Sequence, residues 1–327
     1  MKFGPDVLRI DPAFETDRIA GFLSEQVKSV YRRSGIVVGL SGGIDSAVMS
    51  ELAVRAVGVD AVKGLILPEK ESNPISSSYA RAHAQKLGID YTEIDITSTV
   101  DSVMTYASRD EYIKTLVPEY APGCRYNISL PTDLLERDSF NFYVLQVQLP
   151  DTTTKKKRLG ADAFRVITSF ADIKIRARMV HLYHEAERHN LLVAGTTNRT
   201  EYLLGDFCKY GDGGTDLEPI SHLYKNQIYQ LAEYLGVTPD IIRRSPSPDT
   251  FSLPVTDQEF FFRIPFDKLD HLLYGWEHGI EAEEVAAVMG LPEDAVKRSY
   301  ADFTAKSRAT AHLRQMPGSI PFEMQRM

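Results

Sequence analysis

Residues 39–46 form the first group of side chains whose types and spacing can do chemistry. They read Gly39-Leu40-Ser41-Gly42-Gly43-Ile44-Asp45-Ser46. Glycines let a backbone approach a ligand closely, and free N–H groups at a helix start favour an anion. The hydroxyls of Ser41 and Ser46 add donors, and the Asp45 carboxylate beside a phosphate site is suited to holding a divalent cation. The octapeptide therefore predicts a phosphate-binding loop with a cation next to it.

The residues around this octapeptide predict a strand that turns into a helix. Residues 36–40 are a short, β-branched apolar run, and Ala47, Val48 and Leu52 follow at helical spacing. No Gly-Lys-Ser/Thr follows the glycines, which excludes the Walker loop, and the absence of Gly-x-Gly-x-x-Gly argues against a nicotinamide-dependent dehydrogenase. A glycine-rich turn without a ligand is the alternative, which the order of strand, glycines, acid and helix disfavours.

Residues 191–204 repeat the pattern of strand, turn and helix. An apolar strand is expected at 191–194, and Gly195-Thr196-Thr197-Asn198 leads to a short helix that begins near Glu201. At the end of a strand, Thr196 can contact a nucleotide and Glu201 can complete a Mg²⁺ shell. An ordinary connection between strand and helix explains the local pattern equally well.

Several charged or turn-forming stretches leave their own role open. On a helix expected at 171–189, Lys174 and Arg178 share a face while Arg176 points elsewhere, a pattern that also fits a solvated surface. A glycine-rich acidic loop and a proline turn are typical surface features. The stretches in question are 209–216, Lys225 at a helix start, 246–249 and 312–315.

Strands expected at 36–40, 62–67, 91–96 and 191–194 alternate with helices. This alternation predicts an α/β fold with a doubly wound parallel sheet and ligands at the carboxyl ends of the strands. A first helix is expected from an N-cap at Thr16 to about Arg32. We interpret residues 1–327 as a single domain, with a C-terminal helical extension at 255–327 that has helices near 266–275, 281–289 and 293–306.

Residues 105–170 break this alternation. They contain four prolines, polar clusters and the basic run Lys155-Lys156-Lys157-Arg158, without clear secondary-structure elements. Long segments of this kind are uncommon in compact domains and often form lids. We therefore expect a long inserted segment that is a candidate lid, although a solvated loop tip explains the basic run more simply.

Composition narrows the class of protein. The chain has 327 residues, an apolar fraction of 43% and a net charge of −8, which disfavours a nucleic-acid partner. Cys124 and Cys208 lack CxxC spacing, which indicates a reducing compartment rather than a disulfide scaffold. No run approaches 18 apolar residues and no signal-peptide core is present, so the expected location is cytoplasmic, away from membranes.

Taken together, these stretches resemble the NAD synthetases, which belong to the N-type ATP pyrophosphatases. The matching motifs cover about 35–105 and 171–315, in the family's order. They are SGGIDS at 41–46, (N/D)IKxRxRM at 172–179, GTxNxxE at 195–201, KYGDGGxD at 209–216, the lysine at 225, the PSPD turn at 246–249 and HxR at 312–314.

The resemblance implies a role for each matched residue. Mg²⁺ ligands would be Asp45 and Glu201, and catalytic residues would be Asp45, Lys225 and, as a candidate base, Asp216. The ATP contacts would be Gly39, Leu40, Ser41, Gly42, Gly43, Ile44, Asp45, Ser46, Thr196, Lys225 and Ser247. Contacts to nicotinic acid adenine dinucleotide would be Arg176, Lys209, Asp216, His312 and Arg314.

The resemblance also implies the reaction. The substrate carboxylate would attack the α-phosphorus of ATP, and ammonia would convert the acyl-adenylate to the amide with release of AMP and pyrophosphate. The family is typically a homodimer. Because the first motif begins at Gly39, no room for a glutaminase domain is expected, so the nitrogen would come from free ammonia or a separate glutaminase.

Three features depart from the family pattern, and all lie on the acceptor side: Asp172 in place of Asn, Leu313 in place of Lys, and the long segment at 105–170. One alternative therefore keeps the chemistry and changes the acid, to nicotinate mononucleotide or another carboxylate. A tRNA-modifying ATP pyrophosphatase is disfavoured by the acidic charge and the two unclustered cysteines. A DNA-binding helix-turn-helix at 281–298 is disfavoured by its acidic residues.

Overall fold

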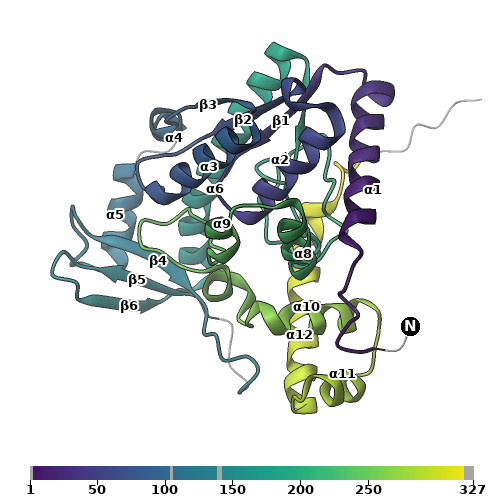
Figure 1. Cartoon of the computed structure of the whole chain (residues 1–327). Helices are drawn as coiled ribbons and strands as arrows, with labels where there is room; N and C mark the ends of the chain where they lie inside the picture. Colours follow the sequence, from purple (N-terminus) through teal and green to yellow (C-terminus); the bar gives the residue numbers. More distant parts are fainter. Residues whose placement is uncertain (1–2, 104–105, 138–141, 320–327) are drawn as a thin grey trace, which may run out of the picture.

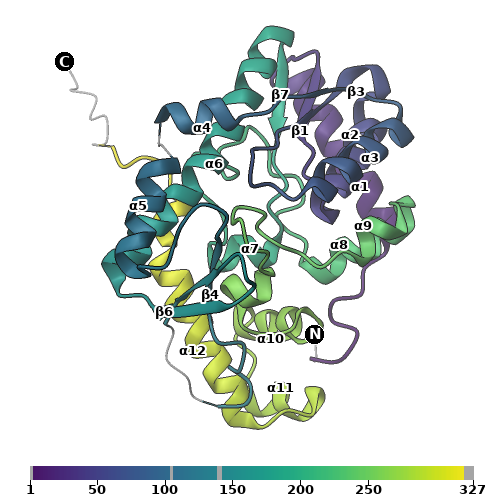
Figure 2. The same ribbon diagram turned by 90° about the vertical axis from the view of Figure 1, so that its left-hand side faces the viewer.

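The computed structural model describes residues 3–103, 106–137 and 142–319. Its centre is a parallel sheet with the strand order β3-β2-β1-β7 (Figures 1 and 2). The strands are β1 (Gly35–Gly39), β2 (Val62–Ile66), β3 (Asp90–Glu93) and β7 (Leu191–Ala194). The predicted parallel sheet is confirmed, although the third strand ends three residues before the expected position.

Helices cover both faces of this sheet, as the doubly wound fold requires. Ile36 and Val38 of β1 pack into one apolar cluster, while the intervening Val37 packs into another on the opposite face. This alternation is what a pleated strand with two covered faces produces. One face carries α1 (Pro12–Glu25), α2 (Ile44–Val57), α3 (Pro74–Leu87), α8 (Lys225–Leu235) and α9 (Pro239–Arg243), and the other carries α4 (Thr97–Val103) and α6 (Ala161–His189).

The first helix begins earlier than predicted, and the assignment of Thr16 as its N-cap is wrong. Asp11 is the cap, because its Oδ1 accepts hydrogen bonds from the backbone N–H of Ala13 (3.0 Å) and Phe14 (3.2 Å), and Pro12 occupies the first helical position. Thr16 is buried inside the helix, which ends in a π-helical turn at Gln26–Val30 (η1).

The expectation that residues 105–170 lack regular elements is also wrong. The described part of this segment, 106–137 and 142–170, forms α5 (Tyr106–Leu116), the start of α6, and an antiparallel sheet of the order β4-β5-β6 (Figure 1). The strands are β4 (Arg125–Ser129), β5 (Val144–Gln148) and β6 (Thr154–Arg158), so the basic run is a strand. The apolar side chains of this sheet pack with Ile113 of α5 and Ile167 of α6; they are Tyr126, Ile128, Leu145 and Val147.

The C-terminal helices pack together at one end of the molecule (Figure 2). Val285, Ala286 and Val296 lie in the core that these helices share, which explains the apolar pattern without a DNA-binding function. Within the described ranges, no helix is long and apolar enough to cross a membrane. The C-terminal elements are η3 (Gln258–Phe262), α10 (Phe266–Glu277), α11 (Ala282–Met289), α12 (Glu293–Ala309) and η4 (Ala311–Arg314). Two further short helices are η2 (Val59–Ala61), before β2, and α7 (Arg199–Leu204), after β7.

Candidate active site

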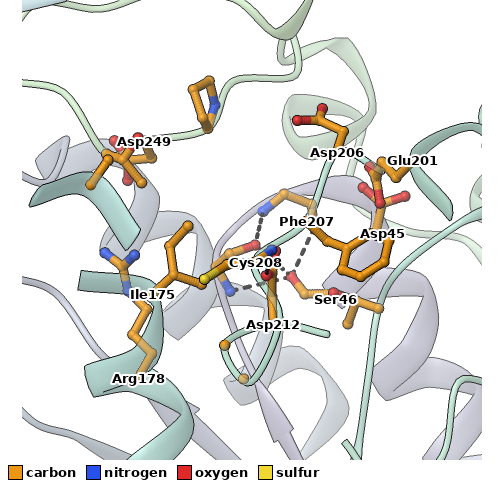
Figure 3. Close-up of a pocket in the computed structure, with 18 of the residues that line it drawn as sticks. Asp45, Ser46, Ile175, Arg178, Glu201, Asp206, Phe207, Cys208, Asp212 and Asp249 are labelled. Atoms are coloured by element: carbon orange, nitrogen blue, oxygen red, sulfur yellow. Dashed lines mark hydrogen bonds between the residues drawn. The ribbon is translucent and has the colours of Figure 1, made fainter. Parts of the chain in front are cut away.

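A cavity of about 900 Å³ opens at the carboxyl ends of the parallel strands (Figure 3). The segments that follow β1, β2 and β7 all line it, as the fold predicts for a ligand site. Most predicted site residues meet here, although they are far apart in the sequence. Those that line the cavity are Gly39, Leu40, Ser41, Gly43, Ile44, Asp45, Ser46, Arg176, Thr196, Glu201, Lys209, Lys225, Ser247 and His312.

The predicted phosphate loop has a tight, internally bonded shape. Gly42 adopts φ +72°, and a Cβ there would lie 2.2 Å from the carbonyl oxygen of Ser76, so only glycine fits. Ser41 Oγ accepts a hydrogen bond from Gly43 N (3.2 Å), and Ser46 Oγ donates to Gly43 O (3.0 Å). Gly43 provides no side-chain cap for α2, and Gly43, Ile44 and Asp45 at the start of this helix line the cavity. An uncapped helix start beside a cavity is an arrangement that favours an anion.

Lys225 joins the two carboxylates that the sequence proposed as metal ligands. Its Nζ lies 2.5 Å from Asp45 Oδ2 and 3.5 Å from Glu201 Oε1, and its side chain is only 3% exposed. Burial alone would lower the pKa of Lys225, but these carboxylates raise it above its usual range. Lys225 is therefore a permanent cation at this position.

Local structure holds Glu201 and Asp45 in place. Asn198 and Glu201 form a capping box at the start of α7, in which Glu201 Oε2 accepts from Asn198 N (3.2 Å). Asn198 Nδ2 also donates to Asp45 Oδ1 (3.0 Å), which links the β7 loop to the phosphate loop. Burial raises the pKa of Glu201 well above its usual range, and the nearby Asp45 carboxylate adds to this effect.

These two carboxylates fit a Mg²⁺ site that substrate completes. Among the described residues no group of three or more His, Cys, Asp or Glu side chains is placed to hold a metal ion. Mg²⁺, however, is usually held by one or two carboxylates together with substrate phosphates. Asp45 and Glu201 supply such a pair beside the phosphate loop.

On the acceptor side, Lys209 links the glycine-rich loop to the C-terminal segment. Its Nζ donates to the carbonyl oxygens of His312 (2.8 Å) and Gln315 (3.0 Å). Arg176 Nε donates to the carbonyl oxygen of Lys209 (3.3 Å), and Arg176 lies 3.7 Å from the Asp172 carboxylate. Two of the departures from the family pattern, Asp172 and Leu313, also line the cavity.

Three predicted site residues are not among the side chains that line the cavity: Gly42, Asp216 and Arg314. Asp216 Oδ2 accepts from Val193 N (2.8 Å), and Tyr183 Oη donates to its Oδ1 (3.2 Å). Arg314 donates to the carbonyl oxygen of Tyr202 (3.0 Å). Their contacts in the structure are thus with the surrounding fold.

Sequence reasoning missed several cavity residues. Asp206 and Asp212 line the cavity (Figure 3), and so does Asp257. Burial raises the pKa of Asp212 and Asp257 to about 6. Asp212 lies in the same glycine-rich stretch as Asp216, so the sequence motif at 209–216 could have identified it. Asp206 and Asp257 carry no local signal, because only the tertiary fold brings them to Lys225.

Residues 15–128 and 134–317 match the NAD synthase family. The NH3-dependent NAD+ synthetase of Rhizobium meliloti is 42% identical, covering 96% of this chain and 94% of its own length. The chain belongs to the NAD synthase family. The enzyme of the same name from Mesorhizobium japonicum is 43% identical, covering 95% and 97%.

Solved structures show the same fold. An NH3-dependent NAD synthetase from Campylobacter jejuni has a TM-score of 0.62 and 25% identity, covering 95% of this chain and all of the other. An NMN synthetase from Francisella tularensis has a TM-score of 0.66 but 22% identity, so it supports the fold alone.

Proposed function

We propose that this chain is an ammonia-dependent NAD synthetase, a ligase that converts nicotinic acid adenine dinucleotide, ATP and ammonia to NAD, AMP and pyrophosphate. Its family membership supports this activity, since relatives at 42–43% identity over nearly the whole chain carry that name. In the structure, the observation that carries the proposal is the group of Asp45, Lys225 and Glu201 beside the phosphate loop.

Activation of the carboxylate is the first chemical problem, because oxide is a poor leaving group. The substrate carboxylate attacks the α-phosphorus of ATP, and the bond to pyrophosphate breaks, giving an acyl-adenylate. The leaving pyrophosphate gathers negative charge, which the buried Lys225 ammonium stabilises and the N–H groups at the start of α2 receive. A Mg²⁺ ion held by Asp45 and Glu201 would neutralise further phosphate charge when bound.

Amide formation is the second step. Ammonia attacks the acyl carbon, the bond to AMP breaks, and the attacking nitrogen loses a proton. The sequence suggested Asp216 as the base, but Asp216 does not line the cavity and its oxygens accept from Val193 and Tyr183. Asp212 is the better-placed candidate, because it lines the cavity and its pKa of about 6 lets the carboxylate accept a proton near neutral pH.

We assign the remaining contacts by side of the cavity. ATP would lie along Gly39 to Ser46, Thr196, Lys225 and Ser247, and the dinucleotide along Arg176, Lys209 and His312. Asp216 and Arg314 do not line the cavity, so we propose that they support the dinucleotide contacts through the surrounding fold. A homodimer and a separate glutaminase that supplies ammonia also remain proposals. The candidate lid is the inserted segment, which reaches the cavity through Tyr143 before β5 and through Phe164 and Thr168 at the start of α6. Its basic strand β6 does not line the cavity.

The proposal is tested by incubating the purified chain with ATP, Mg²⁺ and ammonium and measuring AMP and amide by chromatography. Nicotinic acid adenine dinucleotide, nicotinate mononucleotide and an unrelated carboxylate are compared as acceptors. We expect AMP and NAD in equal amounts with the dinucleotide. If product forms only with another acid, the proposed reaction type holds and the proposed substrate, nicotinic acid adenine dinucleotide, is wrong.

A further inference from the structure

Lys174 is a fully buried cation outside the group described above. It lies on α6 one turn before Arg178, and its side chain is 1% exposed. Its Nζ donates hydrogen bonds to Glu69 Oε1 (2.9 Å), Glu71 Oε2 (2.7 Å) and the carbonyl oxygen of Thr250 (2.9 Å). An ammonium has three protons, so all of its donors are used.

These partners belong to two walls of the cavity. Glu69 and Glu71 lie in the segment after β2, between the cavity-lining residues Leu67 and Ser72. Thr250 ends the turn that carries Ser247, and it lines the cavity itself. Lys174 therefore bonds two walls of the cavity to α6: the segment 67–72 and the turn at 246–250.

Neighbouring bonds fix the same walls and reach the inserted segment. Arg178 Nε donates to Leu67 O (3.1 Å), which holds the end of β2 to α6. From α5, Arg109 Nη1 donates to Glu71 Oε2 (2.7 Å) and Tyr106 Oη donates to Glu69 Oε2 (2.8 Å). Although burial raises the pKa of Glu71, Arg109 and Lys174 lower it overall, so Glu71 is ionised.

A second set of bonds joins the two walls to each other. Asp249 accepts from Asn73 N (3.1 Å) and from Ser76 Oγ (2.8 Å), which ties the turn at 246–250 to the start of α3. Arg244 Nη2 donates to the same Ser76 hydroxyl (2.7 Å). The turn is thus held at Asp249 on one side and at Thr250 by Lys174 on the other.

We propose that Lys174 is a positioning residue for ATP, which sets the distance between the 67–72 wall and the turn that carries Ser247. The inference rests on the proposed function, because it takes Ser247 as an ATP contact. Buried ion pairs contribute little to stability compared with well-packed apolar groups. Three directed hydrogen bonds from one atom instead define the geometry of three segments, and substrate affinity depends on such geometry.

The test compares Lys174→Met with Lys174→Arg and with the triple variant Glu69→Gln, Glu71→Gln, Lys174→Met. The triple variant removes the charges of Lys174 and both glutamates together, so that no buried carboxylate is left unpaired if Lys174→Met fails to fold. Arg109, which loses Glu71 in this variant, keeps Asp110 as its partner (2.7 Å). We expect the KM for ATP to rise about tenfold in Lys174→Met and in the triple variant, with kcat and the KM for the dinucleotide within about twofold. Lys174→Arg should recover part of the ATP affinity.

Lys63→Met is the matched control. Lys63 pairs with Asp90 (3.2 Å) and Glu185 (3.4 Å) at a part of the sheet that does not line the cavity. Lys63→Met should lose about as much stability as Lys174→Met but leave the KM for ATP unchanged. A folded triple variant with wild-type KM for ATP, or equal losses in kcat and in both KM values, would overturn the inference.

ATP binding measured by calorimetry without acceptor separates this inference from the proposed function. If the wild-type chain makes no NAD, the proposed function fails, and the effect of the Lys174 variants on ATP affinity still decides the role of Lys174. Wild-type ATP affinity in the folded variants would refute that role directly.

Discussion

Replacing Asp45 by Asn tests the charge beside the phosphate loop while keeping the size of the side chain. In the structure Asp45 Oδ2 accepts from the Lys225 ammonium at 2.5 Å, and Oδ1 accepts from Asn198 at 3.0 Å. An Asn oxygen can still accept from Asn198, but its amide group presents a neutral partner to Lys225. One charged hydrogen bond is therefore lost, worth about 1.5–3 kcal/mol.

This loss is partly offset because Lys225 keeps Glu201 at 3.5 Å. Removing the Asp45 charge also removes one cause of the raised pKa of Glu201, so Glu201 ionises more easily beside Lys225. We therefore expect the variant to fold, with a melting temperature lowered by less than about 6 °C. Turnover should fall at least about a hundredfold, as for other losses of a directed electrostatic contact.

The assay measures AMP release at saturating ATP and dinucleotide, alongside thermal unfolding. Asp60→Asn is the matched control, because Asp60 is an exposed aspartate in η2, outside the set of cavity-lining residues. It should retain wild-type turnover. Near-normal turnover in Asp45→Asn would refute the assignment of Asp45 as a metal and phosphate-side residue.

Three further predictions concern nitrogen, pH and the inserted segment. Ammonium salts should support amide formation and glutamine alone should not; efficient use of glutamine by the purified chain would contradict this. Burial raises the pKa of Glu218 to about 7 in the folded chain, from 4.5. The folded state therefore holds this proton more tightly than the unfolded state, which adds to the free energy of unfolding. That contribution is complete below pH 4.5 and is lost as the pH rises through 7. Glu218→Gln cannot titrate, so its free energy of unfolding should fall less between pH 5 and 7 than that of the wild-type chain, by at most about 3 kcal/mol. Denaturant titrations at several pH values measure this difference. The same fall in both proteins would exclude Glu218 as its source. Tyr143→Ala should raise the KM for the dinucleotide about tenfold while neutralising Lys155 to Arg158 should not, and the reverse order would show that the basic strand meets the substrate.

The parallel sheet could be predicted because its signals are local. The run at 36–40, its glycines and the helix after it specify a strand, a turn and a helix by spacing alone, and β1 and α2 match them. The start of α1 was missed because Asp11 and Pro12 precede the apolar stripe, whereas Thr16 is a buried helical residue.

The inserted sheet could not be predicted from the sequence. Lysines are depleted in strands, and β6 is almost entirely basic and exposed, so its pairing with β5 depends on contacts across the sheet rather than on its own residues. The apolar face of the inserted sheet forms only when the fold brings Tyr126, Leu145 and Val147 together.

Some residues of the candidate site could likewise be predicted from the sequence, and others could not. Asp45, Glu201 and Lys225 follow from motifs at strand ends and helix starts, and the fold brings them together. Asp206, Asp257 and the cluster around Lys174 join segments that are distant in sequence, and no spacing rule connects them.

The central claim is that the substrate carboxylate attacks the α-phosphorus of ATP. It is tested by labelling the nicotinate carboxylate of the dinucleotide with oxygen-18 and following the label by mass spectrometry after turnover with ATP, Mg²⁺ and ammonium. The mechanism predicts AMP that carries one heavy oxygen in its phosphate, together with unlabelled pyrophosphate. Unlabelled AMP, or label in pyrophosphate or free phosphate, would contradict it.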